Sequence, residues 1–472
     1  MAPTMEPNRS KSWLWKVAVL ALFVFSYFAV RSRIIHDPLI FEEGIFAELI
    51  VNRPPGPMNN MGGRINGQKL YGYFQHPALS YELLRGAGWL AQKQLAYPVY
   101  LDDEAITPRL RTVCSLFQLA LWLTLAGVLC FSKVFPGKWP WAILFVAALS
   151  PLAIKTSVSL QTDNTAGVFF CGLASLLFML AAQKRVPQKI TGIAVFLGAF
   201  IAGLGKQEWS FALALAAITL LPLAALLRLE TSPKTALYTA LLIIFGLVLG
   251  NLANYGVDPA NYTRGFVVMA AFSKVTESSA SQWELAHWMW LMKLRAYCIF
   301  VCLAMCLFFL LSITTNRKQS LFAYLLFLYG GYLLGGYALT DFNYEVRYFA
   351  PSLAVLTVAC ITVAPPSFPA LQNKAAVFVF SLVGLSTVFW GVSFVPGKNL
   401  HLEQLKSGSL RSTPDTVLYI DSGAAWNKPD IDYINNNSDN YEAAQIRIKE
   451  RYGKKLINTP SDNPSPPAPK IE

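Results

Sequence analysis

The chain has 472 residues, of which 54% are hydrophobic and only 14% are charged, and its mean hydropathy is +0.41. This balance excludes an intrinsically disordered protein and an ordinary cytosolic enzyme, because both need a larger share of polar residues. The net charge of +12 does not indicate nucleic-acid binding, because the Lys and Arg residues form short clusters between long apolar runs. The composition predicts a protein that crosses a membrane many times.

About eleven stretches are long and apolar enough to span a bilayer as helices, which takes ~20 residues each. They lie at 13–31, 112–131, 140–157, 164–182, 190–205, 209–227, 235–252, 293–313, 320–339, 349–364 and 375–395. The first stretch resembles a signal peptide, but no small-residue cleavage site follows it, so we expect it to remain as a helix. The expected fold class is an all-α polytopic membrane protein.

Basic residues gather in the connections that follow the second, fourth, sixth, eighth and tenth predicted spans. They are Lys133, Lys138, Lys184, Arg185, Lys189, Arg228, Lys234, Arg317, Lys318 and Lys374. The positive-inside rule then places the N-terminus in the cytoplasm and the C-terminal tail outside, in the periplasm. The sequence thus predicts a multi-pass protein of the cytoplasmic (inner) membrane.

Two regions differ in composition. Residues 1–395 form the predicted transmembrane domain, and residues 396–472 form an outer tail with nearly balanced charges. Within the tail we expect a short strand at 416–420, a helix at 438–452 and disorder after 458. The tail is therefore predicted to be a small α/β or irregular region.

The first outer loop, residues 32–111, is long for a connection between two spans. Its segment 41–50 has the apolar spacing of an amphipathic helix. A second such helix is expected after residue 77, with Leu79, Leu83, Leu84 and Leu90 on one side. Both helices are predicted to lie on the membrane surface.

Cysteine and histidine usage gives no sign of a disulfide framework or a metal site. The seven cysteines all lie in apolar stretches and have no CxxC spacing, so we expect them to pack as small hydrophobic residues. The four histidines show no ligand spacing. We therefore predict no required metal, while a divalent ion held by His76 and a nearby acid stays open.

Ionisable residues gather in the outer connections of the predicted topology. They are Glu42, Glu43, Asp163, Lys206, Glu208, Asp341, Glu345 and Arg347. Charge at membrane depth costs ~2.5–3.5 kcal/mol per residue, so such residues need an explanation. Any one of them is explained by a helix end at the water interface, but their joint placement on one side favours a shared site.

Several short motifs follow one another along the first three quarters of the chain. They are 42–48 (EEGIFAE), 74–79 (FQHPAL), 109–111 (RLR), 149–151 (LSP) with 162–164 (TDN), 203–206 (GLGK) and 346–351 (VRYFAP). In this order they resemble the motifs of GT-C glycosyltransferases, polytopic enzymes that use polyprenyl-phosphate sugars. The branch they resemble contains protein mannosyltransferase-like enzymes and lipid A aminoarabinose transferases. Two positions depart from that pattern, since Glu42 replaces the usual Asp and Gln207 replaces Gly after the lysine.

The resemblance implies an inverting hexosyl- or pentosyltransferase that moves a sugar from a polyprenyl-phosphate donor to a protein, lipid or glycan acceptor. Glu42, or alternatively Glu43, is the expected general base. Lys206 and Arg347 are expected to stabilise the leaving phosphate. The remaining expected substrate-binding residues are Asp163, His76 and Tyr348.

Each of these residues also has a structural explanation that the sequence leaves open. The two glutamates complement a helix dipole, and Lys206 snorkels to the interface. Arg347 forms an ion pair with Glu345, or Asp163 caps the fourth span.

Two other functions remain open for the whole chain. A transporter or flippase of a lipid-linked sugar predicts polar residues near the bilayer midplane and repeated halves. The polar residues lie instead near one interface, but paired glycines at 330–331 and 335–336 keep this alternative open. A scaffold predicts that loss of the tail abolishes function while Glu42 and Glu43 tolerate alanine.

Overall fold

The computed structural model describes residues 8–32, 34–35, 64–65, 68–69, 78–93, 106–131, 134–135, 137–160, 163–183, 186–226, 233–257, 259, 285–315, 321–338, 346–393, 411–412 and 457–458. Some side chains within these ranges are not described, among them those of Asp163, Arg347 and Cys298. Glu42, Glu43 and His76 lie outside the described residues.

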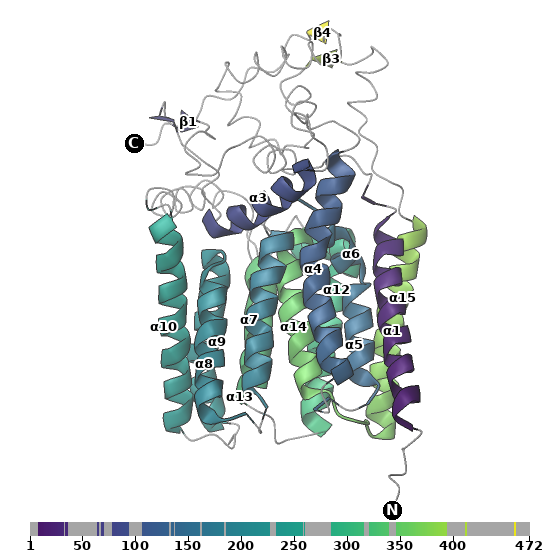
Figure 1. The fold of residues 1–472 in the computed structure, drawn as a ribbon, viewed down its shortest axis with the longest axis vertical. Helices are drawn as coiled ribbons and strands as arrows, with labels where there is room; N and C mark the ends of the chain where they lie inside the picture. The colour runs from purple at the N-terminus through teal and green to yellow at the C-terminus, as the bar shows by residue number, and fades with distance from the viewer. Residues whose placement is uncertain are drawn as a thin grey trace, which may run out of the picture.

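The described part of the chain is a bundle of roughly parallel and antiparallel helices (Figure 1). The helices of the bundle are α1 (Asn8–Arg31), α4 (Ile106–Phe131), α5 (Trp139–Ala148), α6 (Pro151–Ser157), α7 (Val168–Ala181), α8 (Gln188–Gly203), α9 (Gln207–Leu226), α10 (Pro233–Val257), α12 (Leu285–Thr315), α13 (Leu321–Ala338), α14 (Ala350–Val363) and α15 (Ala370–Ser393). By length and hydropathy, six described helices and the bent pair α5–α6 qualify as spans, and four further apolar helices are shorter. Together they occupy the eleven predicted positions, which confirms an all-α polytopic membrane protein.

The third predicted span is two helices, because α5 and α6 are bent by 52°. Ser150 stands at the break with extended backbone, and its hydroxyl accepts a hydrogen bond from Ala153 N at 3.3 Å. Pro151 follows at the first helical position, where its missing N–H costs nothing. The Ser-Pro pair therefore caps a new helix inside a continuous apolar run.

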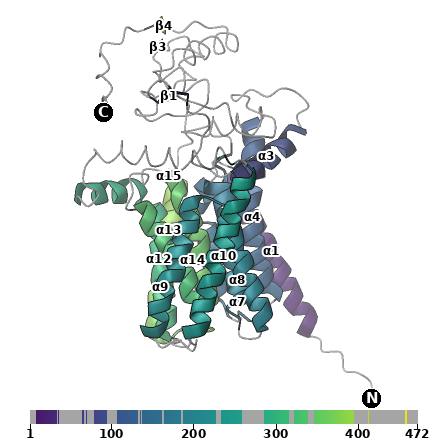
Figure 2. The ribbon, with the colours of Figure 1, turned by 90° about the vertical axis from the view of Figure 1, so that its left-hand side faces the viewer.

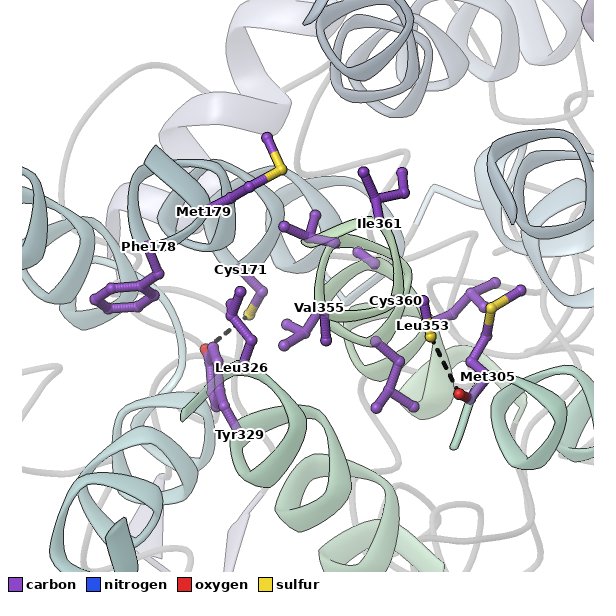
Figure 3. Close-up of a cluster of buried hydrophobic side chains, with 14 of the residues drawn as sticks. Cys171, Phe178, Met179, Met305, Leu326, Tyr329, Leu353, Val355, Cys360 and Ile361 are labelled. Atoms are coloured by element: carbon purple, nitrogen blue, oxygen red, sulfur yellow. Dashed lines mark hydrogen bonds between the residues drawn. The ribbon is translucent and has the colours of Figure 1, made fainter. Parts of the chain in front are cut away.

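The centre of the bundle is α14, in which every residue but Thr362 is buried. A helix that is apolar on all sides is stable only when surrounded, here by α7, α12 and α13 (Figure 3). Tyr329 and Cys171 lie 3.2 Å apart across one side of it, and the Cys360 thiol donates to Met305 O at 3.1 Å on the other. Of the six cysteines described, five are buried, as their apolar context predicted, and all six are free thiols.

Helices α8 and α10 approach each other closely through small residues. A Cβ added to Gly203 would lie 2.8 Å from Leu247 O, and one added to Gly246 would lie 2.7 Å from Phe196 O. A Cβ on Gly250 would overlap Phe200 O. Such small-residue faces let two helix backbones approach closely. Close packing matters within a membrane because lipid tails are as apolar as the helix surface, so the hydrophobic effect does not drive the helices together.

Helix α3 (Ala78–Lys93) lies across one end of the bundle in both views (Figures 1 and 2), and we name this end of the bundle the α3 end. The predicted helix after residue 77 is thus present, with Leu84 completely buried and Leu90 51% exposed. The four leucines were expected on one side, but Leu90 lies in the last part of the helix and contributes little to the bundle.

The described strands are two pairs of two residues each. Strand β1 (Arg64–Ile65) pairs antiparallel with β2 (Gln68–Lys69), with Arg64 opposite Lys69. Strand β3 (Arg411–Ser412) pairs in parallel with β4 (Ile457–Asn458) within the tail. The predicted helix at 41–50, strand at 416–420 and helix at 438–452 lie outside the described residues.

Candidate functional site

Most motif residues that the structure describes lie at the α3 end of the bundle, whereas residues 149–151 form the α5–α6 bend within it. At the α3 end a π-helix, η1 (Asp163–Gly167), precedes α7, and a 3-10 turn, η3 (Val346–Phe349), precedes α14. Turn η1 contacts η3, α3, α4, α6 and α14. Two motifs separated by more than 180 residues in the sequence therefore meet at this turn.

The fourth predicted span starts with a π-helix, and whether the Asp163 side chain caps it lies outside what the structure describes. Asp163 is the first residue of η1, and the buried residues Asn164 and Thr165 follow it. Gln118 on α4 donates a hydrogen bond to Asn164 O at 3.0 Å. Turns of the π type are rare and are frequently found at functional sites.

Lys206 occupies the short connection between α8 and α9 and is only 3% exposed. Its carbonyl accepts hydrogen bonds from Trp209 N at 3.1 Å and Ser210 N at 3.2 Å. Helix α9 therefore begins directly after the lysine, with Gln207 as its first residue. The connection between α8 and α9 is therefore tight, although residue 207 is Gln and the family motif that this segment resembles has glycine there.

The Lys206 ammonium lies over the ring of Tyr348, with 5.4 Å between Nζ and the ring centroid. Tyr348 belongs to η3 and is buried. A cation at this distance from a buried aromatic face is attracted by the ring quadrupole. The structure thus brings together two predicted site residues from different motifs, and Arg347 precedes Tyr348 in the same turn.

Trp209, which the motifs did not single out, packs the lysine turn against η1. Its indole is completely buried. A Cβ added to Gly205 would overlap this ring, and one added to Gly167 would lie 2.7 Å from it and 3.0 Å from Pro351 Cγ. The sequence signal was a tryptophan three residues after Lys206, with glycines where the ring needs room.

Two buried arginines donate hydrogen bonds to polar groups in and around α6, the helix that contacts η1. Arg31 donates to Ser157 Oγ at 2.5 Å, to Ala148 O at 3.2 Å and to Ala153 O at 3.3 Å. Arg111 donates to Val158 O at 3.1 Å. The C-terminal end of a helix carries partial negative charge, so buried cations are stabilised there. The sequence placed Arg31 within the first span, and only the fold shows its role in fixing the α5–α6 bend.

The predicted site residues divide into three groups by what is described of them. Lys206 and Tyr348 are in contact, whereas only the backbone is described for Asp163 and Arg347. Glu42, Glu43 and His76 are among the residues not described, so their chemical roles stay predictions. Within the described residues no three His, Cys, Asp or Glu side chains are grouped to hold a metal ion.

The similarity of this chain to known proteins rests on the fold. No protein-family profile matches the chain, and no curated protein matches its sequence. Among solved structures, the fold is similar to that of ArnT from Cupriavidus metallidurans in the apo state, with a TM-score of 0.50 and 13% sequence identity. The similarity covers 93% of this chain and 77% of ArnT. The chain therefore has a polytopic fold similar to that of ArnT, with little identity in sequence.

Proposed function

We propose that the protein is an integral membrane glycosyltransferase of the GT-C type. It takes a sugar from a polyprenyl-phosphate carrier and transfers it to a protein, lipid or glycan acceptor on the outer side of the cytoplasmic membrane. The observation that carries the proposal is the contact between Lys206 and Tyr348, residues of two different GT-C-like motifs, within an ArnT-like fold.

The fold neighbour supports the choice of reaction. That neighbour is ArnT, whose fold is similar over 93% of this chain. The motifs of this chain resemble the GT-C branch that contains lipid A aminoarabinose transferases. A shared fold at this level of identity leaves donor and acceptor undefined, so the proposal names only their chemical classes.

The reaction needs a base for the acceptor hydroxyl. In the proposed mechanism Glu42, or Glu43 in its place, accepts the hydroxyl proton as the acceptor oxygen bonds to the anomeric carbon of the sugar. The bond between that carbon and the phosphate oxygen breaks on the opposite face, and the polyprenyl phosphate leaves with the electron pair. The product has the inverted anomeric configuration.

The leaving phosphate gains negative charge as the bond breaks, and fixed cations stabilise it best. Lys206 fits this role because it is buried at the α3 end, where a low dielectric strengthens its interaction with an anion. The ring of Tyr348 holds the ammonium without neutralising it. Arg347 would add a planar fork that matches two phosphate oxygens.

The experiment is sugar transfer by the purified full-length protein in nanodiscs, using a panel of polyprenyl-phosphate sugars. The readouts are release of polyprenyl phosphate and labelling of the acceptor. We expect Lys206→Ala to lower kcat about 10²–10³-fold, the usual effect of removing one group that stabilises developing charge. Glu42→Ala or Glu43→Ala, whichever removes the base, should lower it about 10²–10⁴-fold.

The matched control is Lys138→Ala. Lys138 also lies over an aromatic ring, at 5.9 Å from the centroid of Trp139, but it is exposed and belongs to the other end of the bundle. Its loss should leave transfer unchanged. Transfer undiminished in the Glu42, Glu43 and Lys206 variants would remove the assigned site. Absence of transfer with every donor, together with movement of a lipid-linked sugar across vesicles, would replace the enzyme by a flippase.

A further inference from the structure

Asn254, near the outer end of α10, connects three helices at the α3 end. Its side chain is 1% exposed. The amide Nδ2 donates to Leu204 O at 2.9 Å and to Gly203 O at 3.3 Å. The amide Oδ1 accepts a hydrogen bond from Leu79 N at 3.2 Å, at the start of α3. One buried side chain thus bonds α10 to both α8 and α3.

The two carbonyls that Asn254 binds belong to the last turn before Lys206. The last carbonyls of a helix have no partner within it, and a buried one needs a donor from elsewhere. Asn254 supplies that donor, and the close packing of Gly203 against Gly250 brings its backbone near enough to do so. The path of the chain into Lys206 is therefore fixed by a residue 48 positions later in the sequence.

The same amide fixes the start of α3. Leu79 N is one of the first N–H groups of that helix, which also lack partners within it. Helix α3 further contacts η1, the turn that begins with Asp163. Displacement of Asn254 would therefore release the lysine turn and the helix that lies over it together.

We propose that Asn254 is a positioning residue, which holds Lys206 in place for the leaving phosphate and couples that placement to α3. This inference rests on the proposed function. A displacement of about 1 Å in a group that stabilises charge lowers a rate by about 10²-fold, so a hydrogen bond that fixes the lysine backbone affects kcat without touching substrate.

Asn251 is a matched control on the same helix. Its amide donates to Ser210 Oγ at 3.1 Å and to Leu247 O at 2.9 Å, so it joins α10 to α9. It has the same chemistry one turn earlier but binds neither of the two carbonyls before Lys206. A purely structural effect of losing an asparagine from α10 should appear equally in both positions.

The test compares Asn254→Ala, Asn251→Ala, Lys206→Ala and the Asn254→Ala/Lys206→Ala double variant in the full-length protein. We expect Asn254→Ala to lower kcat about 10–100-fold with the same split between kcat and KM as Lys206→Ala. The double variant should be no slower than Lys206→Ala alone, because the positioning effect vanishes once the lysine is gone. Asn251→Ala should change kcat less than twofold.

Hydrogen exchange provides a second readout that does not need activity. Amides of residues 203–206 and of the start of α3 should exchange faster in Asn254→Ala than in Asn251→Ala, when each variant is measured at the same distance below its own melting temperature. Full additivity in the double variant, or equal exchange in the two asparagine variants, would overturn the inference. If the wild type transfers no sugar from any donor, the proposed function fails and the positioning role fails with it. The hydrogen-exchange comparison then decides only whether Asn254 couples the lysine turn to the start of α3.

Discussion

The two ends of the helix bundle are held by different physical interactions. At the α3 end, buried side chains of Arg31, Asn254 and Gln118 bind backbone carbonyls where helices start, stop or bend. At the opposite end, Trp139, Phe308, Phe368 and Phe380 form a cluster of aromatic rings, with Phe308 stacked on Phe380 at 5.1 Å between centroids.

Under the proposed function, the two ends of the bundle have different tasks. Aromatic rings bury large apolar areas and pack without directed bonds to backbone groups, which suits an end that, under the proposed function, only closes the bundle. Directed hydrogen bonds fix the path of each connection, which a site made from several connections requires. We therefore expect damage at the opposite end to lower stability alone, and damage at the α3 end to lower activity as well.

The largest effect on stability is expected from Phe308→Ala. Phe308 is buried and contacts three other rings, so its loss should lower the free energy of unfolding by about 3–5 kcal/mol through lost burial and a cavity. The measurement is unfolding in mixed micelles together with transfer per folded molecule. Transfer should be unchanged, and a parallel loss of transfer would remove the distinction between the two ends.

Arg31→Ala should lower the free energy of unfolding by about 2–4 kcal/mol, because buried carbonyls at the α5–α6 bend lose a charged donor. Unlike Phe308→Ala, it should also reduce transfer, since α6 contacts both η1 and η3. Lys16→Ala is the control. Lys16 on α1 also binds a backbone carbonyl, that of Cys130 at 2.5 Å, but at the opposite end. Equal loss of transfer in the two variants would contradict the comparison.

A pair of glycine substitutions sharpens the comparison within α8 and α10. Gly250→Ala puts a methyl group against the backbone of α8 and should cost about 1–3 kcal/mol. Gly192→Ala, toward the opposite end, meets only Leu242 at 3.8 Å and should stabilise the helix by up to about 1 kcal/mol. Thermal unfolding of both variants checks the signs. A tolerated Gly250→Ala would show that the close backbone contact is not needed to bring Asn254 to its carbonyls.

The sequence by itself determined the number and order of the spans, since the thickness of the hydrocarbon layer sets the length of each apolar run. It also determined which connections lie together, because alternating spans return every second connection to the same end. Lys206, Asp163 and Tyr348 were placed at one end for this reason, and the described helices agree.

The tertiary structure decided which of these residues touch. Three contacts depend on distances between helices. Lys206 lies over the Tyr348 ring, and the Trp209 ring packs between Gly205 and Gly167. Asn254 donates a hydrogen bond to the carbonyl of Leu204 at the end of α8. An apolar pattern sets the length and side of a helix but not its neighbours, because lipid and protein solvate an apolar face almost equally well. Close packing of small residues and buried hydrogen bonds select one arrangement, and these become visible only when the helices are assembled.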